Sequence, residues 1–238
     1  MKKTIKSHVL SLKSSEYARI LALRTVGNFL ILASLFMITK TFSKPLYEEV
    51  RYLISQREGK TYVVSGSSTV PRINNKGALA SFLKNNKIEV LTPVDPNFGI
   101  VIPKIAANSP VIANVDPTDE KEYLKTLLKG VAHTKGTAFP GEGGHIFLFA
   151  HSTDYFWNVG TYNAVFYLLY KLDKGDEINL FYKGKRNVYK VIDKKIIDPS
   201  EVQYLTRKSD AEFLTLQTCW PLGTTLKRLL VFAVRSAK

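Results

Sequence analysis

Three side chains that could together do covalent chemistry stand where expected strands begin or end: Cys219, His151 and Arg228. Cys219 is the only cysteine, and it lies between a β-branched and apolar run and a Trp220-Pro221 pair that should break a strand. A thiol at the end of a strand, rather than in its middle, can face a cleft. Arg228 opens the next apolar run, so a hairpin-like loop between the two strands would place this cation close to the thiol.

The strand expected at residues 145–150 ends at His151, which brings an imidazole to a strand end as well. A cysteine and a histidine from separate strands that meet at one rim form a recurring constellation for acyl transfer by a thiol. A thiol of ordinary pKa about 8.5 is mostly protonated at neutral pH, and a nearby imidazolium or guanidinium stabilises the thiolate. Arginine is also a permanent donor to the oxygen of a tetrahedral intermediate. A lone cysteine without such neighbours is more often a small buried hydrophobe, so the interpretation of Cys219 as a nucleophile depends on His151 and Arg228.

The elements that would position these residues are short β-rich runs separated by turn residues. We predict strands at 88–91, 99–103, 111–115, 145–150, 177–182, 188–197, 211–218 and 229–235. Helices are expected at 119–129 and 163–172, and the Gly- and Pro-dense segment 130–144 is expected to form a long shaped loop. Seven or eight short strands with few helical connections favour a mainly β fold, either a single barrel or a sandwich.

The N-terminal part of the chain predicts a membrane anchor. Residues 1–24 are basic, and residues 25–39, which could extend to 21–40, carry no charge. The competing interpretations are a signal peptide and a buried helix, but no small-residue cleavage site follows the apolar run, which favours a retained transmembrane helix. The positive charge before the span predicts a cytoplasmic N-terminus and a single-pass protein with its C-terminal domain on the extracellular face of the cell membrane.

Between the anchor and the β-rich domain, residues 40–87 are expected to form a stalk and linker. A short helix at 45–60, a flexible linker at 65–77 and one or two helical turns at 78–87 fit the pattern of residues. The folded domain is then 88–238. The net charge of +14 lies mostly before it, since residues 89–238 carry nineteen Lys and Arg against sixteen acids, and this distribution argues against nucleic-acid binding. The four histidines show no metal-ligand spacing with the single cysteine, so no metal site is expected.

Several segments of the chain resemble the motifs of one enzyme family, the sortases, which are membrane-anchored cysteine transpeptidases. Thr215-Leu216-Gln217-Thr218-Cys219 fits the TLxTC signature in full, and 101–105 resembles the family's IPKI strand. The segment 130–151 resembles its G-x-x-H…GTA-x-PGE-x-G…H run, and Arg228 stands where the family has its following arginine. The resemblance covers residues 88–238.

This resemblance implies an eight-stranded sortase-type β-barrel with short helices, preceded by the transmembrane helix. It also implies that Cys219 attacks the backbone of a C-terminal, LPxTG-like sorting signal of a secreted protein and forms a thioacyl intermediate. His151 would be the general acid and base, and Arg228 would hold the oxyanion and the substrate backbone. The acceptor would be an amine of a cell-wall peptide or a pilin lysine at the cell surface.

Further expectations concern the groove and its ligands. We expect Thr218 and Trp220 to line the substrate groove, and His133, which matches a family position in the 130–144 loop, to touch substrate. Some sortases bind calcium through loop carboxylates, but this sequence has no matching acidic cluster and the chemistry requires no cofactor. Two alternatives stay open: a sortase-fold cysteine protease that mainly hydrolyses its intermediate, and a non-enzymatic, membrane-tethered β-barrel adhesin whose cysteine is merely buried.

Overall fold

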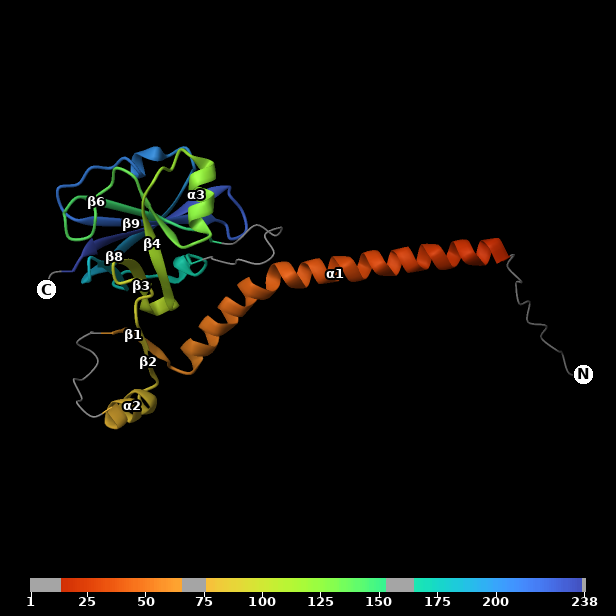
Figure 1. Cartoon of the computed structure of the whole chain (residues 1–238), viewed down its shortest axis with the longest axis horizontal. Helices are drawn as coiled ribbons and strands as arrows, with labels where there is room; N and C mark the ends of the chain where they lie inside the picture. Colours follow the sequence, from red (N-terminus) through yellow and green to blue (C-terminus); the bar gives the residue numbers. More distant parts are fainter. Residues whose placement is uncertain (1–13, 66–75, 153–164, 237–238) are drawn as a thin grey trace, which may run out of the picture. The chain divides into compact units, whose positions relative to one another are not determined.

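The computed structural model describes residues 14–65, 76–152 and 165–236 (Figure 1). The chain divides into two compact units, residues 1–44 and 45–238. The first unit is built on helix α1 (Ser14–Arg57), whose segment Ser15–Lys40 is long and apolar enough to cross a membrane by its length and composition. Large apolar side chains such as Phe29 and Leu30 lie exposed on it, as a lipid-facing helix requires. The predicted helix at 45–60 forms as the last part of α1 rather than as a separate element.

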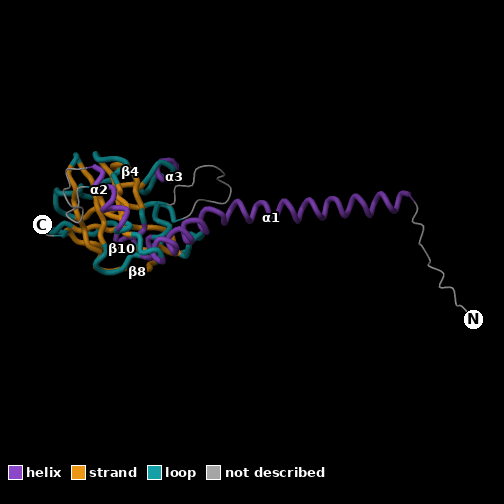
Figure 2. Tube along the Cα trace, turned by 90° about the horizontal axis from the view of Figure 1, so that it is seen from below, coloured by secondary structure: helices purple, strands orange, loops and turns teal. Residues whose placement is uncertain are grey.

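Eight strands of the second unit close into a barrel, which confirms the predicted fold class. Their spatial order is β10-β8-β7-β3-β4-β5-β6-β9, with β9 hydrogen-bonded to β10 to close the ring. Closure leaves no unpaired edge in this sheet. Figure 2 shows how the strands gather in the barrel while the loops run around it. The strands are β3 (Phe98–Ile102), β4 (Ala107–Val115), β5 (Val131–Thr134), β6 (His145–Phe149), β7 (Glu177–Tyr182), β8 (Lys185–Ile197), β9 (Phe213–Trp220) and β10 (Lys227–Arg235).

Outside the barrel, β1 (Thr61–Val64) pairs in parallel with β2 (Ile88–Leu91). The strand predicted at 88–91 therefore forms, but it is not a barrel strand, and its partner β1 lies in the range expected to be stalk. Val64 and Leu91 pack against Val101 and Phe181, which explains why this small sheet forms. Helix α2 (Lys76–Asn85) supplies the helical turns expected near 78–87, and residues 66–75 of the predicted linker lie outside the described residues.

Two helices were predicted in the connections between barrel strands, and only one of them forms within the described residues. The helix predicted at 119–129 is α3 (Glu120–Leu127), which Asp119 caps by accepting a hydrogen bond from the backbone N–H of Glu122 at 3.1 Å. The helix predicted at 163–172 is wrong for the described residues 165–172, which form turns and a 3₁₀ helix, η2 (Leu169–Lys171). Apolar side chains of this segment, including Phe166 and Leu172, are fully buried against the barrel, so tertiary packing overrides its helical pattern.

Alternate residues of the barrel strands pack into two different hydrophobic clusters. Residues of all eight strands, such as Leu148, Leu216 and Leu229, fill the inside of the barrel. The residues between them on β6, β9 and β10 turn outward, where Phe149 and Leu230 pack in a second cluster with Leu127 of α3. Successive side chains of a strand point to opposite faces, so this division also decides which way the residues at the strand ends point.

Candidate active site

The pairing of three neighbouring strands aligns the three residues singled out from the sequence. In the antiparallel β9–β10 pair, Arg228 lies directly opposite Cys219, which confirms the prediction that these two residues lie close together. In the parallel β6–β9 pair, Phe149 lies opposite Gln217, and extending this register by two residues brings His151 beside Cys219. Neighbouring strands lie about 4.8 Å apart, so at the level of the backbone Cys219 lies between His151 and Arg228.

The same alternation puts all three residues on the outer face of the barrel. Cys219 is two residues after Gln217 and three after Leu216, whose side chain fills the interior, so its own side chain turns outward. Arg228 shares the face of Leu230, and His151 shares the face of Phe149, both of which belong to the outer cluster. The candidate site is therefore an outer rim of the barrel, where a polypeptide substrate has access, and not a cavity inside it.

Backbone and side-chain hydrogen bonds fasten the two strand ends that carry the thiol and the imidazole. The N–H of Ala150 donates to the carbonyl of Gln217 at 3.1 Å, and the hydroxyl of Thr218 donates to the carbonyl of Ala150 at 2.9 Å. These bonds continue the β6–β9 ladder up to the residues just before His151 and Cys219. They restrict how far the two reactive side chains can move apart.

Arg228 is held by the loop that connects β9 to β10. Its Nη1 donates to the carbonyl of Thr225 at 2.9 Å and to the carbonyl of Lys227 at 3.1 Å. These bonds use Nη1 alone, and the planar guanidinium has donors on its other nitrogens as well. Arg228 can therefore keep its place in the loop while it donates to a further oxygen.

The protonation of Cys219 reflects two opposing effects. Burial raises the pKa of the Cys219 thiol, and the positive charge of Arg228 lowers it by less. The expectation that neighbouring charge would stabilise the thiolate is therefore only partly met, because removing the thiol from water outweighs the guanidinium. The net shift favours the neutral thiol over the thiolate.

Thr218 does not line the groove as predicted. Its side chain is 2% exposed and lies on the inner face, where its hydroxyl donates a hydrogen bond to the carbonyl of Ala150. Thr218 therefore positions the strand ends from inside the barrel. Trp220 is partly buried against the interior cluster, and its ring lies 5.6 Å from the ring of Tyr170, centroid to centroid.

His133 is also placed differently from the prediction that it touches substrate. It lies on β5, within the segment expected to be loop, and its side chain has no exposed surface. Its Nδ1 accepts from the backbone N–H of Asn114 at 3.3 Å and its Nε2 donates to the carbonyl of Ala138 at 3.0 Å, while the ring stacks on Phe139. Burial lowers the pKa of His133, so it is a neutral residue of the scaffold.

Tyr170 is a neighbour of the site that the sequence did not reveal. It belongs to η2, in the segment where a helix was expected, and its contact with Trp220 joins parts of the chain fifty residues apart. No local pattern of residue types signals such a contact. Within the described residues, no group of three or more His, Cys, Asp or Glu side chains could hold a metal ion.

Comparison with known proteins gives a consistent set of relatives. The family model for the Sortase domain matches residues 100–236. Sortase D of Bacillus subtilis (strain 168) is 31% identical over 137 residues, which are 56% of this chain and 61% of that protein. The solved structure of Sortase C1 of GBS Pilus Island 1 superimposes with a TM-score of 0.51 at 27% identity, over 59% of this chain and 64% of that one. Sortase C-1 from Actinomyces oris gives a TM-score of 0.50 at 26% identity, over 82% of this chain and 99% of that one. The chain thus spans less than two thirds of the length of the first two relatives.

Proposed function

This chain belongs to the sortase family, and from that premise we propose that it is a cysteine transpeptidase whose nucleophile is Cys219. Its substrates would be secreted proteins that carry an LPxTG-like C-terminal sorting signal, and its acceptor an amine at the cell surface. The observation that carries the proposal is the register of β6, β9 and β10, which aligns His151, Cys219 and Arg228 across one outer face.

In the first half-reaction the Cys219 thiolate attacks the scissile carbonyl carbon. A bond forms between Sγ and that carbon, and the carbonyl becomes a tetrahedral oxyanion to which Arg228 donates. When the carbon–nitrogen bond breaks, His151 as imidazolium gives its proton to the departing amine. The products are the released C-terminal fragment and a thioester between Cys219 and the substrate.

In the second half-reaction an acceptor amine attacks the thioester carbonyl. Neutral His151 takes a proton from the attacking nitrogen, an amide bond forms, and the carbon–sulfur bond breaks to regenerate Cys219. Water that attacked in place of the amine would yield a free carboxylate instead. The protease interpretation therefore differs from transpeptidation only in which nucleophile resolves the same thioester.

The decisive experiment incubates the full chain, in detergent micelles, with LPxTG-type peptides in the presence and absence of an acceptor amine. We expect mass spectrometry to find a peptide–amine conjugate when amine is present, and a peptide adduct on Cys219 when it is absent. Exclusive hydrolysis in the presence of excess amine would favour the protease. Conjugate formation that survives the substitution Cys219→Ala would contradict the proposed nucleophile, and the absence of any cysteine adduct would favour a non-enzymatic protein.

The proposal also includes the location of the protein and its independence of cofactors. The apolar span Ser15–Lys40 would be a single-pass anchor with the catalytic domain outside the cell. A membrane-impermeant thiol reagent added to intact cells should then label Cys219, whereas labelling only after lysis would contradict this topology. Because neither half-reaction uses a metal ion, adding a chelator such as EDTA should leave conjugate formation unchanged, and a loss that calcium restores would contradict independence from cofactors.

A further inference from the structure

Tyr170 lies between the end of helix α1 and the residue that follows the candidate nucleophile. Its hydroxyl donates a hydrogen bond to the carboxylate of Glu49, in the part of α1 that belongs to the barrel unit. Its ring lies 5.6 Å from the indole of Trp220, at an angle of 50°. Trp220 is joined by a peptide bond to Cys219. One side chain therefore connects the juxtamembrane end of α1 to the catalytic strand.

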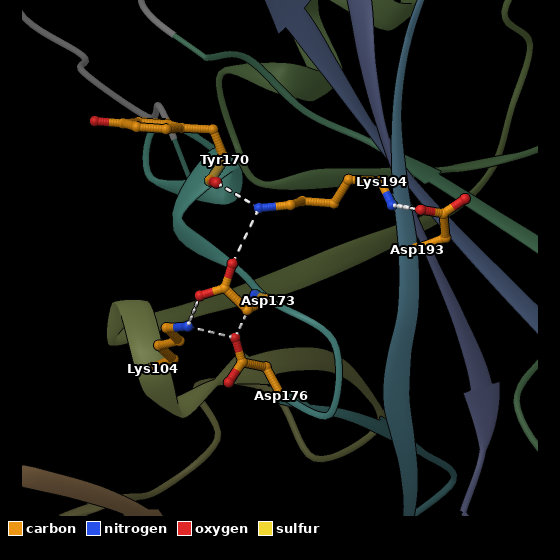
Figure 3. A network of polar contacts seen from close by, with 6 residues as sticks. All are labelled: Lys104, Tyr170, Asp173, Asp176, Asp193 and Lys194. Atoms are coloured by element: carbon orange, nitrogen blue, oxygen red, sulfur yellow. Dashed lines mark hydrogen bonds and ion pairs between the residues drawn. The ribbon is translucent and has the colours of Figure 1, made fainter.

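The backbone of Tyr170 is held independently from the barrel side. Nζ of Lys194, on β8, donates to the carbonyl of Tyr170 at 2.9 Å, and the Tyr170 ring points away from this contact (Figure 3). Lys104 Nζ lies 2.7 Å from Asp173 and 2.7 Å from Asp176, which fixes the chain just after η2 (Figure 3). With its backbone fixed in this way, Tyr170 has mainly its ring orientation left to set, and the bond to Glu49 sets it.

The carboxylate of Glu49, which accepts from Tyr170, is largely withdrawn from water and lies beside a cation. Lys171 Nζ lies 3.4 Å from the Glu49 carboxylate, and both side chains are about three-quarters buried, at 26% and 23% exposure. The same ammonium group lies 5.3 Å from the ring centroid of Tyr52 and 4.8 Å from that of Tyr170. Charges withdrawn from water in this way interact more strongly than exposed pairs, and the aromatic rings favour the cation.

The loop that follows Trp220 lies at the surface of the protein. Pro221, Gly223 and Leu226 are exposed, and a prominent bond within the loop joins the N–H of Thr224 to the carbonyl of Pro221 at 3.0 Å. A shift of the indole would pull on the backbone of β9, in which Trp220 directly follows Cys219. The contact with Tyr170 opposes this shift from the side of the ring.

We propose that Glu49, acting through Tyr170, positions Trp220 and with it the Cys219 thiol, so that residues 45–57 of α1 are part of the working catalytic unit. Glu49 and Tyr170 are positioning residues in this scheme. The effect on turnover rests on the proposed transpeptidase function, but the effect on the reactivity of Cys219 does not.

The test compares Glu49→Ala, Tyr170→Phe and their combination in the full chain, solubilised in detergent micelles. Glu48→Ala is the matched control, because Glu48 is the preceding residue of the same helix and pairs with Arg51 at 2.7 Å instead. Glu49→Gln is the conservative variant, since its amide oxygen can still accept from the Tyr170 hydroxyl. Two rates are measured for each protein: alkylation of Cys219, the only cysteine, by iodoacetamide, and conjugation of peptide to amine.

We expect Glu49→Ala and Tyr170→Phe each to speed alkylation by about three- to tenfold, the size of effect that loss of one ordinary hydrogen bond produces. Peptide kcat/KM should fall in the same variants, because a more open thiol is less well placed for the scissile carbonyl. The double variant should behave like either single one, since both remove the same contact. Glu49→Gln should stay near the parent protein, and so should Glu48→Ala.

Melting temperatures of Glu49→Ala and Tyr170→Phe that match the parent protein separate positioning from general destabilisation, because partial unfolding would also expose the thiol and lower turnover. Equal alkylation rates in the parent protein, Glu49→Ala and Tyr170→Phe would overturn the proposal, and so would strictly additive effects in the double variant. If the parent protein forms no conjugate at all, the proposed transpeptidase function fails, while the alkylation rates still decide whether Glu49 positions Cys219.

Discussion

The strands β6, β9 and β10 carry polar residues near both ends, and the two ends are built differently. At one end lie His151, Cys219 and Arg228. At the other end lie His145 at the start of β6, Glu212 just before β9 and Arg235 at the end of β10. The same three strands thus present a histidine and an arginine twice, in two surroundings that can be compared directly.

At the end with His145 and Arg235, the polar groups bond to one another. The carbonyl of Arg207 accepts from His145 Nδ1 at 3.0 Å, and the hydroxyl of Thr215 donates to Nε2 at 2.9 Å. Arg235 donates to Glu212 at 2.9 Å and to Asn187 at 3.0 Å. Glu212 also accepts from the hydroxyl of Tyr189, which is fully buried.

At the end with Cys219, the guanidinium of Arg228 and the thiol are bonded differently. Arg228 bonds to carbonyls of its own loop, and Cys219 is a half-buried free thiol. Bonds that are saturated within the protein contribute stability, whereas donors and a thiol with remaining capacity are available to a substrate. The difference in hydrogen bonding therefore distinguishes a scaffold end from the end proposed to be reactive, although the residue types are similar.

The histidine pair gives the largest expected contrast between the two ends. His151→Gln should lower turnover by roughly 10²–10⁴-fold, because it removes the proposed general acid and base. His145→Gln should leave turnover of the folded protein unchanged and lower the free energy of unfolding by about 1–3 kcal/mol, because it breaks up a buried hydrogen-bonded group. Conjugation rates and urea denaturation measure the two effects. An equal loss of turnover in both variants would mean that the two strand ends do not differ in function.

The arginine pair should give the next largest contrast. Arg228→Lys should lower turnover by about 10²–10³-fold, because a lysine cannot keep its loop bonds and donate to the oxyanion with the geometry of a guanidinium. Arg235→Lys should leave turnover unchanged and cost about 1 kcal/mol in the free energy of unfolding, through its bonds to Glu212 and Asn187. Normal turnover in Arg228→Lys would assign this residue to the scaffold as well.

The pH dependence of Cys219 alkylation sharpens the description of the reactive end. Because burial raises the pKa of Cys219, the alkylation rate should keep rising with pH beyond the range of an ordinary thiol. Arg228→Gln should move the midpoint to still higher pH, since the guanidinium lowers this pKa. Arg235→Gln is the matched control and should leave the midpoint in place. A midpoint that moves to lower pH in Arg228→Gln would contradict the electrostatic contact.

The smallest expected effect is the pH dependence of stability contributed by the buried histidines. Burial lowers the pKa of His133 and of His145 from 6.5, so the folded protein binds fewer protons than the unfolded chain in acid. The free energy of unfolding should therefore be fully retained above pH 6.5 and should fall as the pH drops below that value. In the double variant His133→Gln/His145→Gln, the free energy of unfolding measured by urea denaturation should decrease less steeply below pH 6.5. If this decrease is the same in the double variant and the parent protein, other titratable groups cause it.

Local patterns predicted the parts of the fold that depend on neighbours in the chain. The strand at 177–182 forms with the predicted bounds as β7, and the hairpin-like connection places Arg228 opposite Cys219 as expected. Asp119 starts a helix because its side chain caps it locally. The short strand β5 was missed because its four residues lie within the Gly- and Pro-dense segment 130–144, and its strand partners β4 and β6 are not its immediate neighbours in the chain.

The sequence by itself determined which residues stand at strand ends, because the alternation and the breaks of the strands are local properties. It could not determine which of these side chains face the interior, since that depends on closure of the barrel. Closure buries His133 and turns Thr218 inward, and it brings Tyr170 against Trp220. It also raises the pKa of Cys219 above what neighbouring charge alone suggests, because desolvation is a property of the packed structure rather than of the motif.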